Sequence, residues 1–368
     1  MEAQRVCEAL IKRGHDVKVI CAGGAPMPDT EDWIDPKGVP VRIYGRHQTG
    51  ALKDLVFALQ VGRMLMRERR NYQLVYFLMQ GLHLALGLPV ARALKKPILM
   101  KISSSIVIPI LSKSLSGRME LGWLRKWARY VMILNDGVRQ QAIEEGFSPQ
   151  KLVWMPNPVD TTEFSPAGPV ERARLREKFG VPATAPVILY CGRLAAIKAL
   201  PSLLEAFGSI SVKFPEAMLV LLGDGPDRAA LVEQAKRLQL SEKNIRFMGQ
   251  VEPGLIPLWA KISDIFALVS HSEGFSCALA EAMSTGLACV VSDIPANRQL
   301  IRSGEQGFLT PVGDPEAIAR AIVQLLEEPL LRERMGQTGR QTILENYSID
   351  MVADRYETLI RDALAPRD

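Results

Sequence analysis

Short apolar runs alternate with amphipathic stretches along most of the chain. In the second half, runs of four or five residues rich in Val, Ile, Leu and Phe are typical of strands buried in a parallel sheet. These predicted strands are Val187–Cys191, Met218–Leu222, Ile245–Met248, Ile265–Val269 and Cys289–Ser292. Helical periodicity lies between or after them, at Leu200–Lys213, Asp227–Leu238, Ser276–Ser284 and Pro315–Glu327. The alternation predicts an α/β, doubly wound domain.

The first half has the same rhythm. One predicted helix ends at Arg13 and another covers Lys53–Arg69, and the predicted strands are Val17–Cys21, Leu74–Phe77, Ile98–Ile102 and Val131–Leu134. A doubly wound sheet normally begins with a strand that takes a central position, whereas this sequence starts at the first helix. We therefore expect either an N-terminal truncation or a central position that is filled in another way. An empty position would leave apolar surface wet, at a cost of ~25 cal/mol per Å².

Prolines mark the middle of the chain. Proline fixes φ and lacks an N–H, so a proline-dense stretch cannot be a central strand or a helix interior. The six prolines of this stretch are Pro156, Pro158, Pro166, Pro169, Pro182 and Pro186. We expect a linker region here, between an acceptor-side domain at 1–160 and a second domain at 161–347, followed by a terminal helix at 348–368. Two such domains would place a cleft at the carboxyl ends of their strands.

Composition narrows the class of protein. A chain of 368 residues is long enough for two domains. Five cysteines without CxxC spacing and four scattered histidines predict neither a disulfide framework nor a metal site, and favour a reducing compartment. Residues 1–160 carry 23 Lys and Arg against 14 Asp and Glu, whereas residues 161–368 carry 22 against 26. The basic half predicts contact with an anionic membrane surface or a phosphorylated acceptor; a solvated basic face without a partner is the alternative.

No secretory leader is expected, and the protein is predicted to be cytoplasmic. The uncharged run between Arg70 and Arg92 is interrupted by Gln, His, Gly and Pro, so it predicts a buried strand and a core helix rather than a membrane span. Trp123 and Trp127 lie among basic residues at helical spacing, which fits either a membrane interface or an ordinary helix with its tryptophans in the core. A second basic cluster contains Arg63, Arg67, Arg69 and Arg70. We therefore expect loose peripheral contact with the inner face of a membrane, and no nucleic-acid partner.

The segment HSEGFSCALAEAMSTG, from His271 to Gly286, follows a predicted strand and enters a helix near Ser276. A helix that begins there offers free main-chain N–H groups and a positive dipole end, which suit a diphosphate. Ser276 could cap this helix with its hydroxyl. Glu273 precedes the helix and Glu281 lies inside it, so two carboxylates can accept hydrogen bonds from sugar hydroxyls. The pair alone is also common by chance on a surface helix.

A second motif, CGRLAAIKA, comes directly after the predicted strand that ends at Cys191. It brings Arg193 and Lys198 to the same edge of the sheet. Two cations there can neutralise a diphosphate and stabilise the charge on a leaving nucleoside diphosphate. An exposed turn with Arg and Lys is the ordinary alternative, and the presence of both motifs at equivalent places favours a binding site.

Two weaker motifs follow the same plan. LLGDGPDRAAL, at residues 221–231, ends a strand in a tight glycine turn and starts a helix with proline. FMGQV, at residues 247–251, closes another strand and could lay main-chain groups beside a base.

The combination GRLxxxK, GDGPxRxxL, FxGxV and EGFxxxLxEAMxxGxxxVxSD, in this order, resembles glycosyltransferase family 4. Members of that family are retaining enzymes of the GT-B fold, with two Rossmann-like doubly wound domains facing a central cleft. The resemblance extends to NPVD at Asn157–Asp160 and to the helix near Ser348–Leu364, which in that family crosses back to the first domain. It implies transfer of a hexose-type sugar from a nucleoside-diphosphate sugar, with UDP or GDP expected, to a hydroxyl acceptor. Cell-surface polysaccharide or glycolipid synthesis is the implied setting.

Carried over by position, the resemblance implies that Arg193 and Lys198 hold the diphosphate, Glu281 the ribose, and Glu273 the sugar beside the reacting carbon. The other implied donor-binding residues are Gly192, Asp224, Met248, Val251, Gly274 and, through main-chain groups, Phe275, Ser276, Cys277 and Leu279. The family needs no divalent metal, and the two cations offer a physical reason. Its reaction retains the anomeric configuration by front-face attack, with the leaving phosphate helping to take the acceptor's proton.

The sequence departs from the family at three places. Ala199 stands where a glycine is usual, a mild change if the backbone there is helical. The family's glycine-rich loop would precede Met1. Serines occupy the stretch Lys101–Ser105, where members often carry a histidine, and His83 is expected to be structural. A non-catalytic nucleotide-sugar-binding protein or subunit is therefore the alternative function. An epimerase on the same plan is disfavoured, because no separate acid/base constellation stands out.

Overall fold

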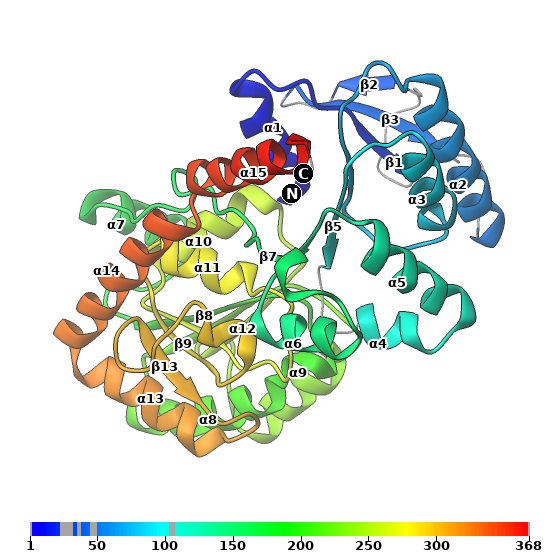
Figure 1. Ribbon diagram of the computed structural model, residues 1–368. Helices are drawn as coiled ribbons and strands as arrows, with labels where there is room; N and C mark the ends of the chain where they lie inside the picture. The colour runs from blue at the N-terminus through cyan, green and yellow to red at the C-terminus, as the bar shows by residue number, and fades with distance from the viewer. Residues whose placement is uncertain (1, 23–31, 35–37, 45–49, 103–106, 367–368) are drawn as a thin grey trace. The chain divides into compact units, whose positions relative to one another are not determined.

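The computed structural model describes residues 2–22, 32–34, 38–44, 50–102 and 107–366 (Figure 1). Contacts divide the chain into two units. The first unit contains Met1–Pro158 and Ile349–Asp368, and the second contains Val159–Ser348.

The second unit is built on one parallel sheet of six strands. In spatial order they are β10 (Ile245–Gly249), β9 (Met218–Leu222), β8 (Val187–Cys191), β11 (Ile265–Leu268), β12 (Ala288–Ser292) and β13 (Gly307–Thr310). The five predicted strands are confirmed, and their central members are buried on both faces, as a parallel sheet requires. Strand β13, a run of four residues, was not predicted. A Cβ at its first residue, Gly307, would lie 2.2 Å from the Cys289 carbonyl oxygen, so a glycine is needed there.

Helices cover both faces of this sheet (Figure 1). One layer contains α8 (Leu200–Lys213), α9 (Arg228–Arg237) and α13 (Pro315–Glu327). The other contains α10 (Ile256–Ile262) and α11 (Cys277–Ser284), with α7 (Pro169–Lys178) and α14 (Pro329–Asn346) packed beside them. The prediction of a linker throughout the proline-dense stretch was wrong at α7. Its Pro169 takes the first helical turn, where a missing N–H costs nothing.

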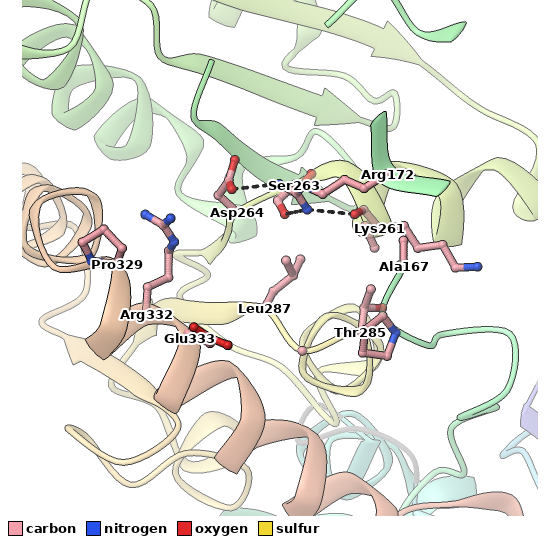
Figure 2. A pocket seen from close by; sticks show the side chains of 13 residues that line it. Ala167, Arg172, Lys261, Ser263, Asp264, Thr285, Leu287, Pro329, Arg332 and Glu333 are labelled. Atoms are coloured by element: carbon pink, nitrogen blue, oxygen red, sulfur yellow. Dashed lines mark hydrogen bonds and ion pairs between the residues drawn. The ribbon is translucent and has the colours of Figure 1, made fainter. Parts of the chain in front are cut away.

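A shared carboxylate holds α7 to the amino ends of β8 and β11 (Figure 2). Asp264 accepts hydrogen bonds from Arg172 and Arg176, each at 2.8 Å, and from the Val187 amide at 2.9 Å. Arg176 is 5% exposed, and its remaining donors bind four carbonyl oxygens. Burial lowers the pKa of Arg172, although the Asp264 carboxylate opposes that shift. The polar groups at the amino ends of β8 and β11 therefore serve to attach α7 to the sheet.

The first unit contains two sheets among its described residues. Strands β4 (Val75–Phe77), β5 (Ile98–Ile102), β6 (Tyr130–Ile133) and β7 (Leu152–Trp154) are parallel, and the second sheet has the order β1 (Val19–Ala22), β3 (Pro40–Tyr44), β2 (Asp32–Ile34). In the described ranges no strand pairs with both β1 and β4. Ile20 of β1 and Val75 of β4 instead pack against one hydrophobic cluster on α2 (Gly50–Arg67), which contains Val61, Met64 and Leu65.

Helices pack on both faces of the four-stranded sheet. On one face lie α3 (His83–Ala93), α4 (Val107–Ser112), α5 (Leu115–Trp127) and α6 (Asp136–Glu144). On the other face α1 (Glu2–Lys12) packs with α15 (Ile349–Leu364), where Tyr356 and Leu359 meet Val6 and Leu10. The uncharged run forms β4 and α3, as predicted. Among the described residues, no helix is long and apolar enough to cross a membrane.

Two tryptophans and one histidine of the first unit pack against its core side chains. Trp123 and Trp127, both on α5, stack with ring centroids 5.3 Å apart. They are partly buried against the core, which favours the interpretation with the tryptophans on the core side. His83 lies against Phe57 and Phe77, at 5.3 and 6.2 Å between ring centroids, and burial lowers its pKa. These contacts are those of a structural histidine.

Removal of the Asp264 carboxylate should severely destabilise the second unit. Asp264→Ala would leave two partly or fully buried arginines without their counterion, which costs about 3–5 kcal/mol. Urea unfolding followed by circular dichroism measures the loss. Glu171→Gln is the matched control, because its ion pair with Lys261 involves a carboxylate that is 48% exposed and should contribute less than about 1 kcal/mol. Equal losses in the two variants would contradict the structural role of Asp264.

Candidate functional site

The predicted motifs meet at the carboxyl edge of the six-stranded sheet. Since all six strands run parallel, the loops after Cys191, Leu222, Gly249 and Leu268 leave the sheet at one edge. This edge lies opposite the amino ends of the strands, where Asp264 binds Arg172 and Arg176. A cavity of about 290 Å³ beside Asp264 is lined by residues such as Arg172, Thr285 and Arg332 (Figure 2). None of the predicted donor-binding residues line this cavity.

The loops after β8 and β9 touch through their main chains. The Leu194 amide donates to the Asp224 carbonyl at 3.0 Å, and the Gly192 amide donates to the Leu222 carbonyl at 2.9 Å. A Cβ at Gly223 would lie 2.0 Å from the Gly192 carbonyl oxygen, and one at Gly225 would lie 2.2 Å from that of Leu194. Gly223 and Gly225, predicted only as turn residues, are therefore required for the close contact between the two loops.

Arg193 leaves this stacked pair of loops toward solvent. Its side chain is exposed and forms no ion pair with any described residue. Its carbonyl oxygen accepts the buried Tyr190 hydroxyl at 2.9 Å, and burial raises the pKa of that tyrosine. These main-chain hydrogen bonds fix the position of the Arg193 Cα, and the exposed guanidinium can bind an anion. Asp224 is also exposed, and its carboxylate accepts the Gly225 amide at 2.7 Å.

Lys198 and Glu273 form an ion pair. The Lys198 Nζ and the Glu273 Oε1 are 2.5 Å apart, with side chains 19% and 12% exposed. Ser270 donates to the same Oε1 at 2.7 Å, and the His271 amide donates to the Ile197 carbonyl at 2.8 Å. The two central motifs, predicted only to share an edge, are in direct contact. A cation and a carboxylate are held side by side at the end of β8.

Helix α11 presents its N-terminus at this edge. The Cys277 amide donates to the Phe275 carbonyl and the Ala280 amide to that of Ser276. The amides of Ala278 and Leu279 have no acceptor among the described residues, as is usual for a first helical turn without a side-chain cap. They are suitable donors to an anion.

The prediction that Ser276 caps α11 was wrong. Its hydroxyl makes no hydrogen bond to the helix and instead donates to Asn297 Oδ1 at 2.6 Å, in the buried interior. Asn297 in turn donates to the Ser292 carbonyl at 2.8 Å. The loop that carries Gly274 and Phe275 is thereby attached to the end of β12.

Glu281 lies one turn into α11, about 6 Å along the helix from Cys277 at 1.5 Å per residue. It shares a small recess with Cys191 and otherwise apolar side chains, among them Leu189 and Phe266. Burial, helped by the Glu281 charge, raises the pKa of Cys191 to about 12. This thiol is therefore protonated at neutral pH and is not a nucleophile. Met248 and Val251 lie farther away, at the end of β10, two strands from β8.

Two protein-family models match the chain. The "Glycosyl transferase 4-like domain" matches residues 2–158, and "Glycosyl transferases group 1" matches residues 171–342. The chain belongs to this family of glycosyltransferases. The resemblance inferred from the motifs is confirmed.

Several curated glycosyltransferases are similar to the chain. N-acetyl-alpha-D-glucosaminyl L-malate synthase of Bacillus anthracis is 27% identical over 53% of this chain and 50% of its own length. The putative glycosyltransferase EpsD of Bacillus subtilis is 30% identical over 64% and 62%, respectively. The phosphatidyl-myo-inositol mannosyltransferase of Mycobacterium tuberculosis is 34% identical over 56% and 54%. The chain thus matches between half and about three fifths of the length of these relatives.

Solved glycosyltransferases share the architecture. One from Rickettsia africae matches 100% of this chain and 95% of its own with a TM-score of 0.81 at 18% identity. HepE of Anabaena, in complex with UDP and glucose, matches 89% and 88% with a TM-score of 0.75 at 19% identity. Likeness at this identity shows the fold, which is α/β of the GT-B type, as predicted.

Three polar residues whose contacts hold the loops at this edge were not predicted: Ser270, Ser292 and Asn297. Ser270 and Ser292 come at or just after the ends of β11 and β12, and that position is a usable signal for a strand-edge site. Asn297 lies in the short helix α12 (Pro295–Arg298), and nothing in the sequence indicates its partners. The stretch Ser103–Ser105, considered in place of a histidine, lies outside the described residues.

Ala199 does not have the helical backbone that would make its replacement of the family's glycine mild. Ala199 is left-handed, with φ 50° and ψ 31°, and is 6% exposed. The left-handed region crowds an alanine Cβ against the following carbonyl oxygen, so the family's glycine has a steric basis here.

Ala199→Gly should therefore stabilise the protein. Relief of left-handed strain is worth about 1–2 kcal/mol and the added flexibility of the unfolded chain costs about 0.5–1 kcal/mol, so a net gain of roughly 0.5–1 kcal/mol is expected. Thermal and urea unfolding measure it. Ala195→Gly, at an ordinary φ of −144°, has no strain to relieve and should destabilise. A loss of stability in Ala199→Gly would contradict the strained conformation.

Proposed function

We propose that this chain is a retaining glycosyltransferase that moves a hexose-type sugar from a nucleoside-diphosphate sugar, with UDP or GDP, to a hydroxyl acceptor. One observation carries the proposal. Three features lie at the carboxyl edge of the second unit's sheet: the Lys198–Glu273 pair, the Arg193 guanidinium, which has no ion-pair partner among the described residues, and the α11 amides that have no acceptor among them. Cations and helix amides suit a diphosphate, and the carboxylate beside them suits a sugar.

The roles follow from what each group can do. Arg193 and Lys198 would hold the diphosphate and stabilise the charge that grows on it as the glycosidic bond breaks. Glu273, in the loop before α11, would accept hydrogen bonds from the sugar beside the reacting carbon. Glu281, inside α11, would accept hydrogen bonds from the ribose hydroxyls. The leaving phosphate oxygen would take the acceptor's proton on the same face of the sugar, so that the anomeric configuration is retained.

The Lys198–Glu273 contact separates binding from turnover in a testable way. Lys198→Met should weaken binding of UDP or GDP, because it removes a diphosphate cation. Glu273→Gln should leave nucleotide binding intact or stronger, since it frees Lys198, while donor hydrolysis and transfer fall about 10²–10³-fold. Thermal-shift titration with UDP-, GDP- and ADP-sugars and a nucleoside-diphosphate release assay measure the two effects. A ligand at a hundred times its Kd stabilises by about 2.7 kcal/mol, which a thermal shift detects.

The outcomes distinguish the alternatives. A protein that no nucleotide sugar stabilises at millimolar concentration lacks the donor site. A protein that binds a donor but neither hydrolyses nor transfers it is the non-catalytic binding protein. Glu205→Gln on α8, whose carboxylate is exposed and accepts a hydrogen bond from Gln234, controls for loss of a negative charge and should change neither measurement.

We further propose that the first unit meets an anionic membrane surface at the cytoplasmic face. Exposed apolar residues on α4 and α5 support this proposal: Ile110, Leu115 and Met119 are 59%, 79% and 44% exposed. Lys113 and Arg118 lie exposed among them. Apolar groups beside cations are the pattern of an interfacial helix. A relative that is a phosphatidyl-myo-inositol mannosyltransferase makes a lipid-borne acceptor a reasonable choice.

Vesicle flotation tests this surface. We expect binding to vesicles of phosphatidylcholine with phosphatidylglycerol at low salt, and loss of binding at high salt, where the Debye length shrinks to about 3 Å. Leu115→Ser with Met119→Ser should reduce it. Val212→Ser on α8 removes a comparably exposed apolar side chain, 83% exposed, and should have no effect. Absence of binding at low salt refutes the proposal.

A further inference from the structure

The conformation of Ser276 is unusual for the residue before a helix. Serine is a preferred N-cap because its hydroxyl accepts a hydrogen bond from an amide of the first turn while its backbone is extended. Ser276 has a ψ of 77°, outside that range, and its hydroxyl does not reach the helix. It is 2% exposed and donates to Asn297 instead. Something other than helix chemistry determines its position.

The orientation of Asn297 follows from its partners. The Ser292 carbonyl can only accept a hydrogen bond, so the Asn297 NH₂ group must face it, at 2.8 Å. The Asn297 carbonyl oxygen therefore faces Ser276, and the Ser276 hydroxyl must donate to it, at 2.6 Å. Asn297 is fully buried, so water does not compete for these groups. The end of β12 thus sets the direction of the Ser276 side chain, through Asn297.

The consequence is seen at the start of α11. A capping serine would occupy an amide of the first turn, and those of Ala278 and Leu279 are the candidates. In this structure both remain without an acceptor among the described residues. We infer that Asn297 is a positioning residue for the donor: it withholds the Ser276 hydroxyl from α11 and so keeps these two amides available for the donor diphosphate. The inference rests on the proposed function, because it requires the diphosphate to bind at this helix end.

If Asn297 acts by withholding the Ser276 hydroxyl, then Ser276→Ala should restore the nucleotide affinity lost in Asn297→Ala. A purely structural role of Asn297 would not produce this restoration. Asn297→Ala releases Ser276 to cap α11, and the cap then competes with the ligand. The Kd for UDP, or for whichever nucleotide binds best, should rise about three- to thirtyfold, the ratio that matches the usual strength of a serine cap. Ser276→Ala alone removes the competing hydroxyl and should change the Kd less than about threefold. The double variant should return to the affinity of Ser276→Ala, although it is the least stable of the three.

Titration calorimetry with the nucleotide and urea unfolding are measured on the same samples of the full chain. Ser284→Ala is the matched control: its hydroxyl is buried at the other end of α11, donates to the Phe164 carbonyl at 2.7 Å, and should affect stability without affecting the Kd. If Asn297→Ala does not fold, Asn297→Leu, which is similar in size and equally unable to hold the hydroxyl, replaces it in the cycle.

Each outcome has a definite meaning. Restored affinity in the double variant supports the inference. Additive losses in the double variant, or an unchanged Kd in Asn297→Ala, overturn it and leave the donor site in place. Failure of the unmodified chain to bind any nucleotide overturns the proposed function, and this inference with it.

Discussion

Close contact between main chains at the ends of β8 and β9 is the constraint on which the site depends. Gly223 and Gly225 lie so near the carbonyl oxygens of the preceding loop that no side chain could be accommodated at either position. These close contacts, together with the hydrogen bond from the Leu194 amide, restrict the conformation of the loop after β8. The exposed Arg193 side chain starts from this restricted turn. Pre-placement of this kind lowers the reorganisation needed when an anion arrives.

The second cation is positioned differently, by an opposite charge. Lys198 is mostly buried, and a buried ammonium without a partner would be costly. Glu273 supplies that partner, and Ser270 binds the same oxygen, so the carboxylate is itself held. The pair is neutral as a whole. Under the proposed function, a diphosphate would therefore meet a lysine already in place, with N–H donors to spare, and the sugar would meet a carboxylate whose position is already fixed.

Much of this fold could be predicted, for identifiable reasons. Strands β8, β9 and β12 are apolar runs buried on both faces, where hydrophobic pattern and structure agree closely. The motifs then had to meet at one edge, because parallel strands end together. Helix α7 was missed because prolines dominated its surroundings, and only the position of Pro169 relative to the helix start makes it compatible. The left-handed Ala199 violates a local preference, so no propensity could indicate it.

The site's contacts were less predictable than its location, because they join residues that are distant in sequence. A rule for helix starts reads Ser276 as a cap, and the rule is sound for most helices. It fails here because Asn297, twenty-one positions away, competes for the same hydroxyl. A helix end without its cap is less stable than a capped one, and the buried bonds among Ser276, Asn297 and Ser292 offset that loss. Local rules are expected to fail at such places, since an end that binds a ligand must leave its own donors unsatisfied until the ligand arrives.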